Sequence, residues 1–70
     1  MVIDITTPDG NTLVALNIAT RMLKKVGADK DEIASLQRAV FSADSAVAAR
    51  NAITQATNGA ITFYDPRVGE

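Results

Sequence analysis

Apolar side chains recur at every third or fourth position over residues 12–26, which is the spacing of one face of a helix. Asn11 stands just before this stretch, where its side chain can cap a helix, and Gly27 follows it as a residue that ends helices. Thr7, which precedes a proline, is an alternative cap, and we favour Asn11. The pattern therefore predicts a helix over residues 11–26.

The apolar stripe of this helix is broad. At about 100° per residue it covers an arc of roughly 160°, and the opposite side of the helix is polar. The residues on or beside this arc are Leu13, Val14, Ala15, Leu16, Ile18, Ala19, Met22, Leu23 and Val26. Because two short partner helices cannot cover so wide a stripe, we expect this helix also to contact a second chain.

Two more helices are predicted, over residues 30–42 and 45–57. Asp29 can cap the first of them, and Glu32, three residues on, can complete a capping box. Its apolar seam is narrow and comprises Ile33, Leu36, Val40 and, at its edge, Phe41. The polar residues 42–45 offer caps for a break before the next helix.

The last predicted helix is rich in alanine. Its apolar side is formed by Ala49, Ala52, Ile53 and Ala56. Side chains this small let a neighbouring backbone approach closely. Asn58 and Gly59 are residue types that end a helix, so we expect this one to stop before them.

The two ends of the chain have the composition of β-strands. Residues 2–5 and 60–64 are short stretches rich in β-branched or aromatic side chains. Of two adjacent strand residues one normally points inward, so we expect Phe63 in the core and Tyr64 in the freer position. The tail either pairs with the first segment or lies over a helix. Together the segments predict a single domain over residues 1–70 that is mainly α, with three helices and short extended N- and C-terminal segments.

Size and composition give a second reason to expect self-association. The chain has 70 residues and neither Cys nor His, so it lacks disulfides and the commonest zinc ligands. One core in a chain of this length seldom supplies more than about 3 to 5 kcal/mol. A partner chain is the remaining means of stabilisation, and we expect a homo-oligomer with no metal and no cofactor.

Charge narrows the classes of partner. Seven Lys and Arg stand against eight Asp and Glu, a formal net charge of −1, whereas nucleic acids and anionic lipids select a basic excess. A helix-turn-helix over residues 29–57 is disfavoured for the same reason, since that region has three basic and four acidic residues. Nowhere do about 18 apolar residues run together, and the first residues lack a basic leader. We expect a cytoplasmic protein without a duplex nucleic acid or membrane partner.

The sequence also argues against catalysis. Its only acidic cluster is Asp29, Asp31 and Glu32, and capping at the start of a helix accounts for acidic residues there. Without His, and with no spacing that activates a Ser, Thr or Lys, no pair of nucleophile and base can be assigned. We expect the chain not to be an enzyme.

A basic patch at the end of the first predicted helix is the first candidate site. Arg21, Lys24 and Lys25 lie on its polar side, with Asn17 one turn before them. The patch is either a solvated helix face or a site for a small phosphate-bearing ligand, which a symmetric oligomer would duplicate across its axis.

An aromatic and an arginine near the C-terminus are the second candidate site. Tyr64 can stack on a base, and Arg67, three residues on, can clamp a phosphate or stack in turn. Packing in the core is the alternative role for such aromatics.

The turn Thr7-Pro8-Asp9-Gly10-Asn11, followed by a long apolar helix with basic residues near its end, resembles small phage-encoded helical proteins that act as anti-CBASS sponges. The resemblance implies a compact helical oligomer that binds a cyclic oligonucleotide signal without cleaving it.

The first hypothesis for function is therefore a cytosolic oligomer that sequesters a cyclic oligonucleotide. Phosphates would contact Arg21, Lys24 and Lys25, bases would stack on Tyr64 beside Arg67, and Asn11 or Asn17 would add hydrogen bonds.

A second hypothesis is a helical interaction module that binds a host or phage protein. Its docking surface would be the apolar face of the first helix, formed by Leu16, Ile18, Met22 and Leu23. A third hypothesis is that the chain is a purely structural subunit.

Overall fold

The computed structural model describes residues 1–68, of which Val68 is described in its backbone only. Its elements are β1 (Val2–Asp4), the 3-10 turn η1 (Pro8–Gly10), α1 (Thr12–Lys25), α2 (Lys30–Phe41), α3 (Ala46–Ala56), β2 (Thr62–Tyr64) and the 3-10 turn η2 (Pro66–Val68). The prediction of a mainly α domain with three helices and short extended end segments is thus confirmed. Each helix end lies within one residue of the position expected from the sequence.

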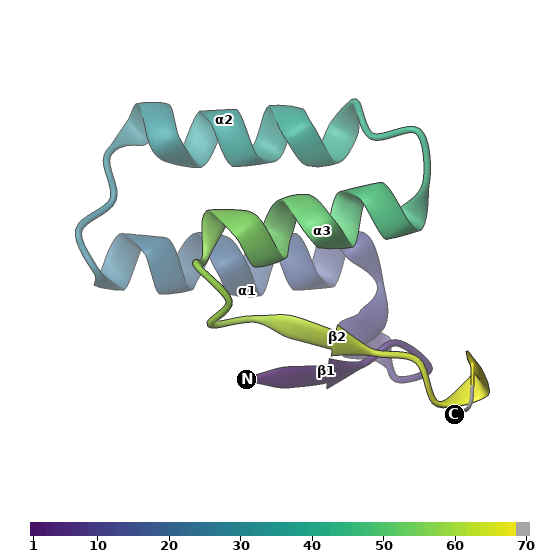
Figure 1. Cartoon of the computed structure of the whole chain (residues 1–70). Helices are drawn as coiled ribbons and strands as arrows, with labels where there is room; N and C mark the ends of the chain where they lie inside the picture. Colours follow the sequence, from purple (N-terminus) through teal and green to yellow (C-terminus); the bar gives the residue numbers. More distant parts are fainter. Residues whose placement is uncertain (69–70) are drawn as a thin grey trace.

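Successive helices run in opposite directions (Figure 1). β2 lies against α3 on the side away from α2, and β1 lies beside β2 (Figure 1). The helix starts are set by local hydrogen bonds. Asn11 Oδ1 accepts from the Leu13 N–H at 2.9 Å, Asp29 Oδ1 accepts from the Glu32 N–H at 2.9 Å, and Ser45 Oγ accepts from the Ala48 N–H at 3.1 Å. Asn11 is therefore the cap of α1, as favoured, and Thr7 precedes η1 instead.

The sequence left open whether the C-terminal extended segment pairs with the N-terminal one or lies over a helix, and the structure shows that the two pair. β1 and β2 pair in parallel, with Val2 opposite Thr62 and Ile3 opposite Phe63. The Ile5 N–H extends the ladder by donating to the Tyr64 carbonyl at 3.0 Å. Parallel strands need a long crossover connection, and here all three helices form it.

The core lies between the three helices and the inner side of the sheet. Its buried apolar residues are Ile3, Ala15, Leu16, Ala19, Leu23, Leu36, Val40, Ala49, Ile53 and Ile61. Thr57 joins α3 to the strand that follows, because its hydroxyl donates to the Ile53 carbonyl at 2.9 Å and accepts from the Ile61 N–H at 3.2 Å. This polar group is buried with both of its roles satisfied.

Several apolar residues lie outside the core, among them Leu13, Val26 and Phe41. Leu13 is 54% exposed and Val26 is 74% exposed, so the chain's own elements leave both residues of the broad apolar stripe uncovered. Val26 follows the last turn of α1, so the helical spacing no longer places it over the core. Phe41, expected at the edge of its seam, is 69% exposed at the last residue of α2.

Candidate ligand-binding site

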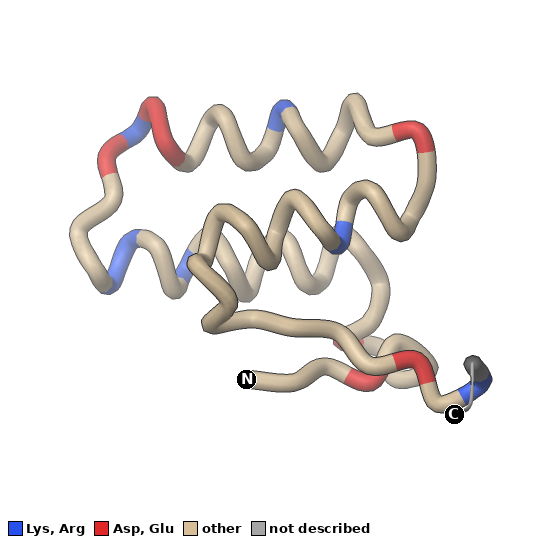
Figure 2. Tube along the Cα trace, in the orientation of Figure 1, with Lys and Arg blue, Asp and Glu red and all other residues tan. Residues whose placement is uncertain are grey.

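The predicted basic patch is present as an exposed surface of α1. Arg21, Lys24, Lys25 and Asn17 are all exposed. Figure 2 shows the basic segments of α1 near the last turn of that helix, far from the C-terminus of the whole chain. Arg21 and Lys25 border a surface hollow of about 280 Å³ that also contains Ile18 and Met22. Lys24 lies outside this hollow.

The other predicted site residues lie elsewhere. Asn11 is used as the cap of α1, so its amide oxygen is already bonded. Tyr64 is 55% exposed at the end of β2, beside Ile5, which contacts η1 just ahead of α1. Arg21 is nine residues beyond the start of α1, or roughly 14 Å along the axis. One copy of the chain therefore does not bring Tyr64 to the basic patch.

The docking surface expected on α1 is smaller than the sequence suggested. Leu16 and Leu23 are only 4% and 8% exposed, because they pack into the core against the other helices. They are not accessible to a partner, which corrects the prediction. Of the four expected contact residues, Ile18 and Met22 remain partly exposed.

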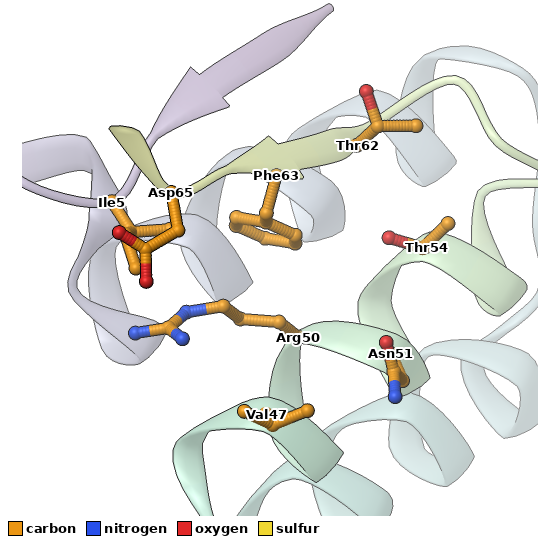
Figure 3. Close-up of a pocket in the computed structure, with 8 residues that line it drawn as sticks. All are labelled: Ile5, Val47, Arg50, Asn51, Thr54, Thr62, Phe63 and Asp65. Carbon is orange, nitrogen blue, oxygen red and sulfur yellow. The ribbon is translucent and has the colours of Figure 1, made fainter. Parts of the chain in front are cut away.

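A pocket between α3 and the sheet brings together polar and aromatic side chains that the sequence pattern did not single out as one site (Figure 3). We call it the α3–sheet pocket. It encloses about 430 Å³ and is lined by Ile5, Val47, Arg50, Asn51, Thr54, Thr62, Phe63 and Asp65. A volume of this size is within the range of small-molecule sites, which is about 300 to 1,000 Å³.

The helical part of the pocket follows from the spacing along α3. Val47, Arg50, Asn51 and Thr54 fall within an arc of roughly 100° on the helix wheel, so they share one face. Ala49 and Ile53 are on another side of α3 and are buried in the core. The same helix therefore covers the core with one face and lines the pocket with the other.

Arg50 is the chief polar group of the pocket. Its side chain runs along the pocket towards Ile5 and Asp65 (Figure 3), and its Nε atom is buried without a hydrogen-bond partner among the described residues. No carboxylate of residues 1–67 is within 4.0 Å of its nitrogens. A buried donor without a partner costs about 1 to 3 kcal/mol, so an acceptor placed there by a ligand is favoured.

Asp65 stands near this guanidinium but is already paired. Its Oδ1 accepts from Arg67 Nε at 2.9 Å, and its Oδ2 accepts from Arg67 Nη2 at 3.2 Å. Hydrogen bonding to Arg67 holds the pKa of Asp65 below 3.8 and raises the pKa of Arg67, and the charge of Arg50 lowers the pKa of Asp65 further. Because Arg67 balances Asp65, the charge of Arg50 is left for a ligand. The predicted phosphate clamp Arg67 is thus engaged within its own segment.

Phe63 supplies the aromatic wall of the pocket. It was expected in the core, but it is half-buried, with its ring in the pocket across from the residues of α3 (Figure 3). Thr54 and Asn51 add a hydroxyl and an amide group from α3. The Thr62 hydroxyl instead donates to the Met1 carbonyl at 3.5 Å. The pocket therefore offers one cation, one aromatic face and neutral hydrogen-bonding groups.

Sequence reasoning missed Arg50, and a signal for it was present. Arg50 is the one charged residue of α3, and Val47 and Thr54 stand three residues before and four residues after it, at spacings that share its helix face. What the sequence could not supply was the opposing wall, since the position of Phe63 depends on how β2 pairs.

The hydrogen bonds that Asp4 and Asp65 each accept predict how this end of the molecule responds to acid. Asp4 Oδ1 accepts from the Thr6 hydroxyl at 2.6 Å and from the Thr6 N–H at 2.9 Å, and these bonds lower its pKa from 3.8. Both carboxyls have a lower pKa in the folded chain than in the unfolded chain. Their stabilising effect is therefore present above about pH 3.8 and is lost as the pH falls through the folded values.

We expect carboxyl resonances of Asp4 and Asp65 to titrate with midpoints below 3.8 in an NMR titration. Thr6→Val removes the hydroxyl donor, so the midpoint of Asp4 should rise while that of Asp65 stays nearly unchanged. A wild-type midpoint for Asp4 at or above 3.8 would contradict the hydrogen bonding described.

No helix within residues 1–68 is long and apolar enough to cross a membrane. In the same residues, no three His, Cys, Asp or Glu side chains are grouped as they would be to hold a metal ion. Comparison with protein-family models, with curated proteins and with solved structures finds no significant match to this chain.

Proposed function

We propose that this chain is a non-catalytic binding protein that holds a small anionic organic ligand in the α3–sheet pocket. The observation that carries the proposal is the buried, unpartnered Nε atom of Arg50 in a pocket walled by the Phe63 ring. An oxygen of a phosphate or carboxylate would pair with this donor, and a charge-assisted bond of this kind is stronger than a neutral one.

The other groups of the pocket suggest the rest of the ligand. A flat ring can stack on Phe63, and sugar or base hydrogen-bonding groups can meet Asn51 and Thr54. A nucleotide combines all three features. The ligand class expected from the sequence, a cyclic oligonucleotide, is thus retained in the proposal with a different set of contacts, one nucleotide unit entering the pocket.

Binding without turnover is part of the proposal. The hydrogen bonds of the described residues include none from the hydroxyls of Thr54 or Thr62 to a carboxylate, and Asp65 is occupied by Arg67. An activated nucleophile needs such a neighbouring base. The groups of the pocket are suited to holding an anion and a ring.

We expect Arg50→Gln to weaken ligand binding by about tenfold or more, because it removes one charge-assisted bond worth about 1.5 to 3 kcal/mol. Calorimetric titration with a cyclic dinucleotide, a nucleoside monophosphate, an aromatic carboxylate and inorganic phosphate would measure this. The matched control is Arg38→Gln, which removes the same charge from an exposed site on α2.

The same panel separates the pocket from the basic patch on α1. In the proposal, amide signals of α3 and β2 shift on titration, and Lys24→Glu leaves the affinity nearly unchanged. Shifts confined to Arg21, Lys24 and Lys25 would instead support the site expected from the sequence. If no compound of the panel shifts the signals of α3, the proposed function is wrong.

A further inference from the structure

Two further surfaces of the molecule carry charges of opposite sign beside apolar side chains. The first, which we call the α1 face, consists of Val14, Ile18, Arg21, Met22 and Lys25. The second, which we call the α2–α3 groove, is lined by Leu23, Glu32, Ser35, Leu36, Ala39, Ala52, Gln55 and Ala56. They share no residue with each other or with the α3–sheet pocket.

The α2–α3 groove is open because the side chains along it are small. Ala39, Ala52 and Ala56 line its walls, and the largely buried Leu36 lies in it. It encloses about 460 Å³. Its one charged residue is Glu32, exposed in the first turn of α2. The groove is therefore lined mainly by apolar side chains and carries one negative charge.

The α1 face has the opposite character. Val14, Ile18 and Met22 follow one another at four-residue spacing and form an apolar row along α1, in which Val14 is 37% exposed. Arg21 and Lys25 border this row and are exposed. Apolar anchors at this spacing are those by which a helix docks into a groove.

We propose that a second copy of this chain docks its α1 face into the α2–α3 groove, with Arg21 and Lys25 of one copy beside Glu32 of the other. Charge complementarity favours a second copy, because each molecule carries both the cationic α1 face and the groove with its carboxylate. The contact joins two different surfaces, so a symmetric dimer makes it twice and a head-to-tail arrangement makes it once per neighbour. The α3–sheet pocket is left open, and this proposal does not depend on the proposed function.

The test is sedimentation equilibrium of the purified chain with charge-reversal variants. We expect a wild-type mass above that of one chain, rising with concentration. The double variant Arg21→Glu with Lys25→Glu, and separately Glu32→Lys, should each weaken association by roughly tenfold or more, since like charges then meet. Circular dichroism checks that each variant keeps its helices, and Glu32→Gln gives a smaller loss of the same sign with less change to the start of α2.

The chain offers a close control for each reversal. Lys24→Glu changes the same charge one residue from Lys25, and Asp31→Lys changes it one residue from Glu32, but neither residue belongs to the proposed contact. Both controls should associate as the wild type does. An equimolar mixture of the two reversal variants should regain association, because the acidic α1 face of one then meets the basic groove of the other.

Several results would overturn the proposal. These are a wild-type chain that stays single at millimolar concentration, an oligomer unaffected by either reversal, controls that weaken association equally, and a mixture that fails to associate. A single chain whose Ile18 and Met22 signals shift with an acidic amphipathic peptide would also overturn it and assign the α1 face to another protein.

Discussion

Gly10→Ala is expected to destabilise the chain by about 3 kcal/mol, which is most of the stability of a domain this small. A Cβ atom at this position would lie 2.6 Å from the carbonyl carbon of Ile5 and 2.5 Å from its oxygen. These are backbone atoms, so no rotation of a side chain can relieve the contact. Either η1 must move away from the end of β1, or the sheet, whose Ile3 and Phe63 pack in or against the core, must shift.

Gly27→Ala is the matched control. Gly27 has a φ of 85° at the end of α1, and the described residues place no atom within 4 Å of a Cβ there. Its substitution should cost about 1 to 2 kcal/mol, from backbone strain alone. Urea denaturation followed by circular dichroism measures both losses. Equal losses in the two variants would show that the contact with Ile5 is not tight.

Ile53→Ala is expected to cost about 3 to 4 kcal/mol, a loss comparable with that of Gly10→Ala. Ile53 has no exposed surface and is one of the two largest side chains that are fully buried. Its removal leaves a cavity among the three helices that the surrounding residues can fill only in part. Because one core in a chain of this length seldom supplies more than about 3 to 5 kcal/mol, the variant should keep little stability and have a substantial unfolded fraction at room temperature.

Val47→Ala on the same helix is the control for Ile53→Ala. Val47 is 62% exposed, so its truncation should change the free energy of unfolding by less than about 0.5 kcal/mol. Thermal unfolding followed by circular dichroism compares the two. A cooperative transition for Ile53→Ala at the wild-type temperature would contradict the core described above.

These stability variants also sharpen the test of binding. Gly10 and Ile53 act on the fold as a whole, whereas the guanidinium of Arg50 lies in a pocket beside the core. A variant at Arg50 should therefore lose ligand while its unfolding changes little. Loss of binding together with loss of folding would point to a structural role for that arginine.

Local sequence determined where the helices begin and end. Asn11, Asp29 and Ser45 each cap a helix with their own side chain, and Gly27 adopts the positive φ expected after α1. Such signals act within a few residues of the chain. They require no knowledge of the tertiary fold, which is why the three helices could be predicted closely.

Tertiary structure decided which apolar positions are covered and which polar ones meet. The helix wheel ranks Leu13 and Leu16 as neighbours on one broad stripe, but the packing of α1 buries Leu16 and leaves Leu13 exposed. Phe63 and Arg50 are thirteen residues apart in sequence and share a pocket only because β2 pairs with β1 beside α3. Periodicity and capping are properties of residues that are close in sequence. The parallel pairing and the pocket depend on contacts between distant segments, and the free energy of such contacts cannot be inferred from a local pattern.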